Sequence, residues 1–273
     1  MSETQSGARN EQTARDINTL GAFCGRRDLP ALTRSAVRQA CGADRVDGMV
    51  LFGGSILAGG DLLADAIRQG IARRYVIVGG AGHTTGALRR RLHAERPDIE
   101  TEGLPEAELF QRYLAAAHGC RADLLETRST NCGNNITLLL ALLEREQVPF
   151  TSILLCQDAA MQLRMDAGMR LHCPGGVRIL NYAAYRAEVV WDGGALAYAR
   201  PIHGMWPMER YVELLLGEIP RLTDDAGGYG PRGKGFIAHV DVPAPVQAAY
   251  ARLRQTFGMA TRAADQHISR QHV

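Results

Sequence analysis

Four short segments of the sequence combine glycines with polar side chains, and these residue types suit the binding of a small molecule. Each segment follows an apolar run and precedes an apolar pattern with helical spacing; they are residues 53–55, 79–85, 129–135 and 157–158. Glycine lets the backbone approach a ligand closely, and the amides at a helix start attract anions. Because all four leave predicted strands in the same sense, we expect them to line a common cleft at one edge of a parallel sheet.

The first two segments are rich in glycine and suit an anionic or nucleotide-like group. The pattern Gly80-x-Gly82-x-x-x-Gly86 directly follows a predicted strand and is one residue longer than the dinucleotide-binding fingerprint. Tight turns between strand and helix explain the same glycines without any ligand. The ligand contacts predicted here are Gly53, Gly54, Ser55, Gly79, Gly80, Gly82 and Thr84.

The other two segments carry amide and hydroxyl side chains. The run 129–135 holds more hydrogen-bonding groups than one helix cap requires, although capping is the alternative interpretation. Arg164 lies less than two helical turns beyond Asp158 and could reach a carboxylate or phosphate, or form an ordinary surface ion pair. The ligand contacts predicted here are Ser129, Thr130, Asn131, Asn135, Gln157 and Arg164.

Three residues are candidates for acid–base chemistry, in the order Glu106, His83 and Asp158. Glu106 follows Pro105 at a predicted helix start, where the helix dipole alone also favours a carboxylate. His83 lies in the second glycine segment, where the alternative is a loop histidine facing water. Metal-ligand spacing is absent among His93, His118, His172 and His203, so no metal site is predicted.

The elements that must position these residues follow from the hydrophobic pattern. Strands are predicted at 48–52, 75–78, 124–125, 152–156 and 177–180, and the alternation of strand, loop and helix predicts an α/β fold with a parallel sheet. Helices are predicted at 105–118, 207–217 and 244–257, with two more within 13–41. We expect an α/β core with N-terminal helices over 13–200, a C-terminal helical annex over 201–260, and a fraying tail over 261–273.

Composition narrows the class of protein. The 273 residues are 46% apolar with a net charge of +2, and the arginines form no basic stripe with aromatics, so nucleic acid is not an expected partner. The six cysteines include no C-x-x-C pair. The longest apolar run, 136–143, is too short to span a bilayer, and the polar N-terminus lacks a secretory pattern, which predicts a cytoplasmic protein without a membrane partner.

The four segments, together with 206–211 and 228–233, resemble the YdcF/SanA/ElyC family, and its cytoplasmic YdcF branch in particular. The resemblance covers most of the chain and implies a Rossmann-like core with an extra helical part that binds S-adenosyl-L-methionine. Glu106 and Asn135 match positions of the family pattern. The chain departs from it at Asn134, where the YdcF branch has glutamate, and at Met161, where many members have histidine.

These observations lead to three alternative functions. The first is an S-adenosyl-L-methionine-binding protein that transfers the methyl group to an acceptor which the sequence does not name. The second is a hydrolase or transferase acting on a small phosphorylated substrate, with the glycine segments, Arg164 and Arg128 binding phosphate. The third is a non-catalytic sensor of a small-molecule ligand, whose helical annex reports occupancy of the site to a partner.

Overall fold

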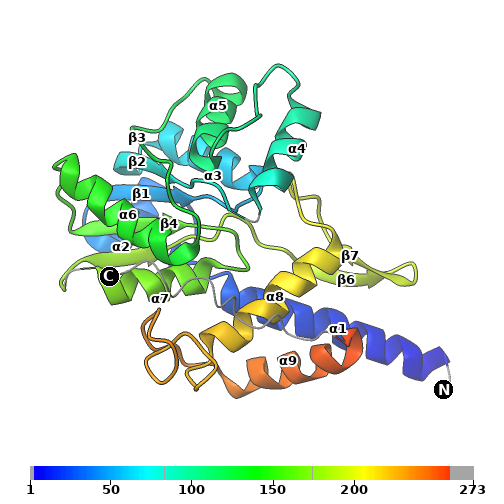
Figure 1. Cartoon of the computed structure of the whole chain (residues 1–273). Helices are drawn as coiled ribbons and strands as arrows, with labels where there is room; N and C mark the ends of the chain where they lie inside the picture. The colour runs from blue at the N-terminus through cyan, green and yellow to red at the C-terminus, as the bar shows by residue number, and fades with distance from the viewer. Residues whose placement is uncertain (1–2, 83, 174, 259–273) are drawn as a thin grey trace.

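A parallel five-stranded sheet forms the centre of the protein. The computed structural model describes residues 3–82, 84–173 and 175–258. The strands lie in the order β3-β2-β1-β4-β5, and every neighbouring pair is parallel (Figure 1). Their bounds are β1 Val46–Phe52, β2 Ala72–Val78, β3 Leu124–Glu126, β4 Ser152–Cys156 and β5 Arg178–Asn181. The chain order reverses between β1 and β4, which is the switch point of a Rossmann-like α/β fold.

Helices cover both faces of the sheet (Figure 1). One face of the strands, including Met49 and Leu51, shares a core with α3 and α5, whereas the other, including Val50, packs with α6 and α7. This two-sided burial explains the nearly continuous apolar strands. The helices are α3 Leu57–Gln69, α4 Thr85–Glu95, α5 Glu106–His118, α6 Cys132–Arg145 and α7 Gln162–His172.

Local signals in the sequence set several of these helix bounds. Gly70 and Gly119 end α3 and α5 in the left-handed conformation, with φ of 61° and 65°, which glycine adopts without a Cβ penalty. Pro105 precedes α5, as predicted. The predicted strands and the helices at 105–118 and 244–257 are confirmed within a few residues, whereas α4 was not among the predicted helices.

The terminal parts of the chain form a helical annex below the sheet (Figure 1). The annex consists of α1 Glu3–Cys24, α8 Met208–Leu222, α9 Ala244–Phe257 and the hairpin β6 Val189–Asp192 with β7 Ala195–Tyr198. A short helix, α2 Arg34–Cys41, leads into β1. Gly193 and Gly194, with φ of 56° and 91°, make the hairpin turn, in which both residues require positive φ.

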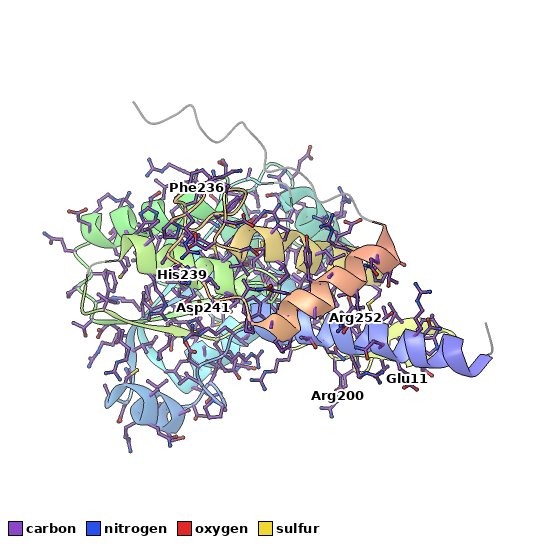
Figure 2. The ribbon with its side chains drawn as sticks, turned by 90° about the horizontal axis from the view of Figure 1, so that it is seen from below. Glu11, Arg200, Phe236, His239, Asp241 and Arg252 are labelled. Carbon is purple, nitrogen blue, oxygen red and sulfur yellow. The ribbon has the colours of Figure 1, made fainter. Side chains whose placement is uncertain are left out.

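The annex differs from the predicted division of the chain in one respect. The sequence placed the N-terminal helices with the core, but α1 packs against α9, α8 and β6. Arg252 of α9 makes two hydrogen bonds to Asp16 of α1, at 2.8 and 2.7 Å, and Figure 2 shows Arg252 between these helices. The hairpin was also not expected. The predicted tail at 261–273 lies outside the described residues.

No helix in the described part of the chain is both long and apolar enough to cross a membrane.

Candidate functional site at the carboxyl edge of the sheet

The four segments singled out in the sequence meet at the carboxyl ends of the strands, and we call this region the carboxyl edge. The side-chain amide of Gln157 donates to the carbonyl of Gly53 at 3.0 Å, which joins the loops after β4 and β1. The amide of Gly80 donates to the Ser129 hydroxyl at 3.2 Å, which joins the loops after β2 and β3. The predicted convergence is therefore confirmed, while the common cleft stays a prediction.

Glu106 is enclosed at the centre of the carboxyl edge. Its Oε1 accepts hydrogen bonds from the hydroxyls of Thr84 at 3.1 Å and Thr85 at 2.8 Å. Burial raises the pKa of Glu106, and bonds from these hydroxyls and the Gly54 amide counteract only part of that shift. The carboxyl group also occupies the space where a side chain at Gly53 would begin. Glu106 thus holds the first two loops together.

Of the other two acid–base candidates, only Asp158 lies among the described residues. Asp158 is fully buried, and its carboxylate accepts from Tyr185 Oη and Trp206 Nε1, both at 2.8 Å, and from the Ala160 amide at 2.9 Å. Burial raises the pKa of Asp158, against the lowering effect of these donors. Asp158 therefore ties the annex residue Trp206 to the core. His83 lies outside the described residues.

Arg164 is placed differently from the free arginine that the sequence suggested. Its Nε and Nη2 bond to the two carboxylate oxygens of Glu218 on α8, at 2.5 and 2.9 Å. The side chains are 12% and 3% exposed, so this bidentate pair is buried between core and annex. The alternative interpretation, an ordinary surface ion pair, is corrected to a buried one. A contact from Arg164 to a ligand stays a prediction, and it would compete with Glu218.

The glycines of the second segment have unequal surroundings. A Cβ at Gly80 would meet backbone atoms of residues 127–129, including the Thr127 carbonyl at 2.8 Å. A Cβ at Gly79 would lie 3.0 Å from the Glu106 Cβ and 3.1 Å from the Gly53 Cα. By contrast, Gly82 is exposed and has only the Thr130 carbonyl at 3.4 Å. Packing alone thus requires glycine at 79 and 80 but not at 82.

The third segment is largely a helix cap. The Asn131 side chain accepts from the Asn134 amide at 3.0 Å, and Asn134 Oδ1 accepts from the Asn131 amide at 2.9 Å, which forms a capping box at the start of α6. The capping interpretation is therefore confirmed for Asn131. Thr130 is exposed, whereas Asn135 is buried in the first turn of α6. Both remain open as ligand contacts.

Two helices that begin at the carboxyl edge have no side-chain cap. α4 starts after Thr84 and α7 after Met161, and neither side chain accepts a hydrogen bond from the following amides. A Cβ at Gly54 would lie 3.4 Å from Thr84 Oγ1 and 3.5 Å from Met161 Cε, so the two helix starts meet at Gly54. The Thr85 and Ala87 amides of α4 already donate to the carbonyls of Gly82 and Thr84, so it is chiefly the aligned peptide dipoles that make this point favourable for a negative charge.

The next residue after Gly54, Ser55, has an unusual side-chain hydroxyl. The residue is 2% exposed, and its hydroxyl is the one buried side-chain polar atom without a hydrogen-bond partner in residues 3–82, 84–173 and 175–258. A buried polar group left unpaired destabilises the folded state by about 1–3 kcal/mol. The adjacent start of α3 is covered instead, because the Ala58 amide donates to the His203 carbonyl of the annex at 3.1 Å.

Sequence reasoning missed a buried amide network that supports these loops. Gln162 Oε1 accepts from the Gln157 amide at 2.8 Å, and Gln162 Nε2 donates to Asn181 Oδ1 at 2.9 Å. Asn181 Nδ2 donates in turn to Asp166 Oδ1 at 2.8 Å. All four residues are buried. The sequence did contain a sign of this network: Gln162 interrupts an apolar helical pattern, and Asn181 directly follows a predicted buried strand.

A second missed cluster centres on Asp61 of α3. Asp61 bonds to Tyr113 at 2.6 Å, His118 at 2.8 Å and His203 at 2.6 Å, while His203 also contacts Glu95 at 2.5 Å. Burial would raise the pKa of Asp61, but these hydrogen bonds outweigh it and lower the pKa. The cluster fastens the His203 loop over α3. Among the described residues, no group of histidine, cysteine and acidic side chains is arranged to hold a metal.

Comparison with known proteins gives a distant relative. An uncharacterized protein of Streptomyces coelicolor is 28% identical to this chain over 170 residues, which are 62% of this chain and 67% of the relative. No family model matches the chain. The fold and site define a Rossmann-like α/β protein with a polar cluster at the switch point of its sheet, and function must be argued from that geometry.

Proposed function

We propose that this chain binds S-adenosyl-L-methionine at the carboxyl edge and belongs to the YdcF/SanA/ElyC family that its motifs resemble. The observation that carries the proposal is the meeting of two uncapped helix starts, α4 and α7, at Gly54. The carboxylate of the ligand fits this point, since main-chain amides bind anions without a basic side chain. Gly54 itself has a φ of 77°, a conformation that glycine adopts without a Cβ penalty; the residue is buried, and its amide bonds to Glu106.

Ser55 supports the same location. Its buried hydroxyl has no partner in the described part of the chain and lies toward Gly59 of α3, so a hydrogen bond to a ligand at the Gly54 backbone would require rotation about χ1. A bond to a charged ligand group contributes about 1.5–3 kcal/mol. In the protein without ligand, the unpaired hydroxyl would destabilise the fold. Binding would supply the missing hydrogen bond.

Methyl transfer to an acceptor is the reaction that this ligand would serve. The ligand supplies an activated methyl group when bound, and the protein must then align the acceptor and exclude water. Glu106 is the candidate to take up an acceptor proton, because its raised pKa lies closer to neutrality than that of an exposed carboxylate. Its carboxyl already accepts from Thr84 and Thr85, so an acceptor proton would have to compete with these hydroxyls.

A small phosphorylated substrate is the second candidate. The same uncapped amides favour a phosphate as well as a carboxylate. Calorimetric titration with S-adenosyl-L-methionine, S-adenosylhomocysteine, NAD and ATP side by side separates the two. Binding of the first two alone supports the proposal, and binding of ATP alone contradicts it. Product assays then separate a methyltransferase from a ligand sensor, which binds without turnover.

Two buried serines provide a matched test of the location. Ser55 and Ser129 are each 2% exposed, but only Ser129 has a hydrogen bond, from the Gly80 amide. We expect Ser55→Ala to weaken S-adenosyl-L-methionine binding at least about tenfold while leaving stability unchanged or higher. Ser129→Ala should cost about 0.5–1.5 kcal/mol of unfolding free energy. Unchanged affinity in Ser55→Ala would place the ligand elsewhere.

A further inference from the structure

A large cavity lies outside the carboxyl edge, in the angle between the core and the annex. It has a volume of about 1140 Å³ and is bounded by α1, α7, the segment 185–188 after β5 and the segment 239–241 before α9. We call it the α1–α7 cavity. Figure 2 views the molecule from below, and His239, Asp241 and Arg200, which line the cavity, are labelled on that face. The volume exceeds that of most small-molecule sites, about 300–1,000 Å³.

The charged residues of the cavity are mostly arginines. Acidic side chains at the wall are fewer: Asp166, Glu188 and Asp241. The arginines come from the segment just after α1, from α7 and from the two segments that flank the β6–β7 hairpin; they are Arg26, Arg27, Arg170, Arg186 and Arg200. An excess of guanidinium groups around a hollow raises the local concentration of anions.

One carboxylate fixes two of these arginines at the wall. Asp166, whose side chain is 3% exposed, accepts from Arg26 Nη1 at 3.3 Å and from Arg170 Nε at 2.9 Å. Asn181 Nδ2 donates to the same carboxylate at 2.8 Å and holds it in place. Arg26 Nε also bonds to Asp28 at 2.8 Å and Arg170 Nη2 to Asp166 at 2.9 Å, and the two arginine side chains are 41% and 42% exposed. They are oriented for a ligand before it arrives.

Other arginines of the cavity are not neutralised. Arg186 and Arg200 are exposed and form no ion pair with a described residue. Arg27 donates to the Ala183 carbonyl at 2.9 and 2.7 Å rather than to a carboxylate. Burial lowers the pKa of Arg27, and repulsion from Arg186 adds to that effect. The region therefore carries positive charge that a ligand could offset.

The cavity also has apolar and hydroxyl surfaces. Phe23, Leu163 and Val240 line it. Tyr211, which is 1% exposed, lines it with its hydroxyl over Gly21, where a Cβ would approach the Tyr211 oxygen to 2.7 Å. That hydroxyl makes no hydrogen bond to a described residue. A side chain at position 21 would collide with this hydroxyl, so the packing requires glycine there.

We propose that the α1–α7 cavity is a second ligand site, which binds a small organic diphosphate of the nucleoside diphosphate class. Arg26 and Arg170 are joined through Asp166, and Arg186 and Arg200 are further exposed guanidiniums of the same wall. A planar guanidinium pairs with phosphate in a bidentate manner. The apolar wall accommodates an organic body. The proposal does not depend on the function proposed for the carboxyl edge.

The test is calorimetric titration of the full chain with ADP, with adenosine as the uncharged probe. Arg186→Gln/Arg200→Gln removes two exposed charges without breaking an ion pair to a described residue, so folding should be preserved. The matched control is Arg68→Gln/Arg145→Gln, which removes two exposed charges outside the cavity.

We expect ADP to bind and adenosine to bind at least about tenfold more weakly. The cavity variant should lose at least about tenfold in ADP affinity and the control less than about twofold.

Three results would overturn the proposal: no heat with ADP at millimolar concentration, equal binding of adenosine, or equal losses in the cavity and control variants. S-adenosyl-L-methionine distinguishes this site from the carboxyl edge. The cavity variant should keep its affinity for that ligand, and Ser55→Ala should keep its affinity for ADP. If the cavity variant loses both ligands, the two sites are one and the proposal of a second site fails.

Discussion

The carboxyl edge and the α1–α7 cavity both gather polar side chains, but these side chains have different partners. At the carboxyl edge, Glu106, Asp158 and Gln157 already have hydrogen-bond donors or acceptors within the protein. In the cavity, Arg186 and Arg200 have no carboxylate partner in the described part of the chain, and space remains in front of them. Only the first region had a recognisable sequence pattern.

A motif can therefore encode the internal packing of a loop as readily as a ligand contact. Most of the predicted contacts at the carboxyl edge fasten one loop to another, and what remains for a ligand is main-chain amides and Ser55. The cavity, in contrast, is built from segments that carry no motif. Three experiments test this comparison.

The largest effect is expected from Arg164, which tests whether a predicted ligand contact is structural. Arg164→Met leaves the buried Glu218 carboxylate without its bidentate partner, and we expect a loss of about 3–5 kcal/mol in unfolding free energy. Urea denaturation followed by circular dichroism measures it. Arg164→Met/Glu218→Leu, which removes both charges, should recover most of the loss.

The control for that experiment is Arg145→Met, which breaks an exposed pair with Glu146 and should change stability by less than about 1 kcal/mol. Should Arg164→Met keep full stability but lose affinity for S-adenosyl-L-methionine, Arg164 would be a ligand contact after all, and the carboxyl edge would resemble the cavity more closely than we infer.

A smaller effect separates two glycines of one loop. Gly80→Ala forces a Cβ against the backbone of residues 127–129, so we expect a loss of about 1–3 kcal/mol in the free energy of unfolding. Gly82→Ala has room and should change it by about 0.5 kcal/mol or less. Thermal or urea unfolding of both variants measures the contrast. Equal losses of unfolding free energy in the two variants would mean that packing does not explain why residue 80 is glycine.

The smallest effect is a pH dependence at Glu106. Its pKa is raised in the folded state above the ordinary value of 4.5, mainly by burial, so its contribution to stability is fully present below that value and is lost as pH rises through the folded pKa. Glu106→Gln removes the titrating group. We therefore expect the stability of this variant relative to the wild type to increase from about pH 4 to pH 8.

Urea unfolding across that range, with Glu108→Gln as the control on the same helix turn, checks the prediction. A constant difference between Glu106→Gln and the wild type at every pH would show that the Glu106 carboxyl is not desolvated. It would then behave as the solvated helix-start residue that the sequence also allowed, and the carboxyl edge would be more open than its packing indicates.

The sequence by itself determined the strands, most helices and the convergence of the four loops. These features depend on local terms: the spacing of apolar residues, the left-handed glycine at Gly119, the proline before α5 and the cap at Asn131. Parallel strands joined by helices then place every strand-to-helix loop at the same edge, whatever the detailed packing. This is why the fold and the location of the candidate site could be predicted together.

Only the tertiary structure decided which polar groups are already paired. The partner of Arg164 is Glu218, 54 residues later, and the donor to Asp158 is Trp206 of the annex. The cavity likewise lies between α1, α7 and segments more than 150 residues after α1 in the chain, so no contiguous segment encodes it. A side chain's partners depend on which distant elements bury it, and that burial follows from the summed hydrophobic contacts of the whole chain rather than from neighbouring residues.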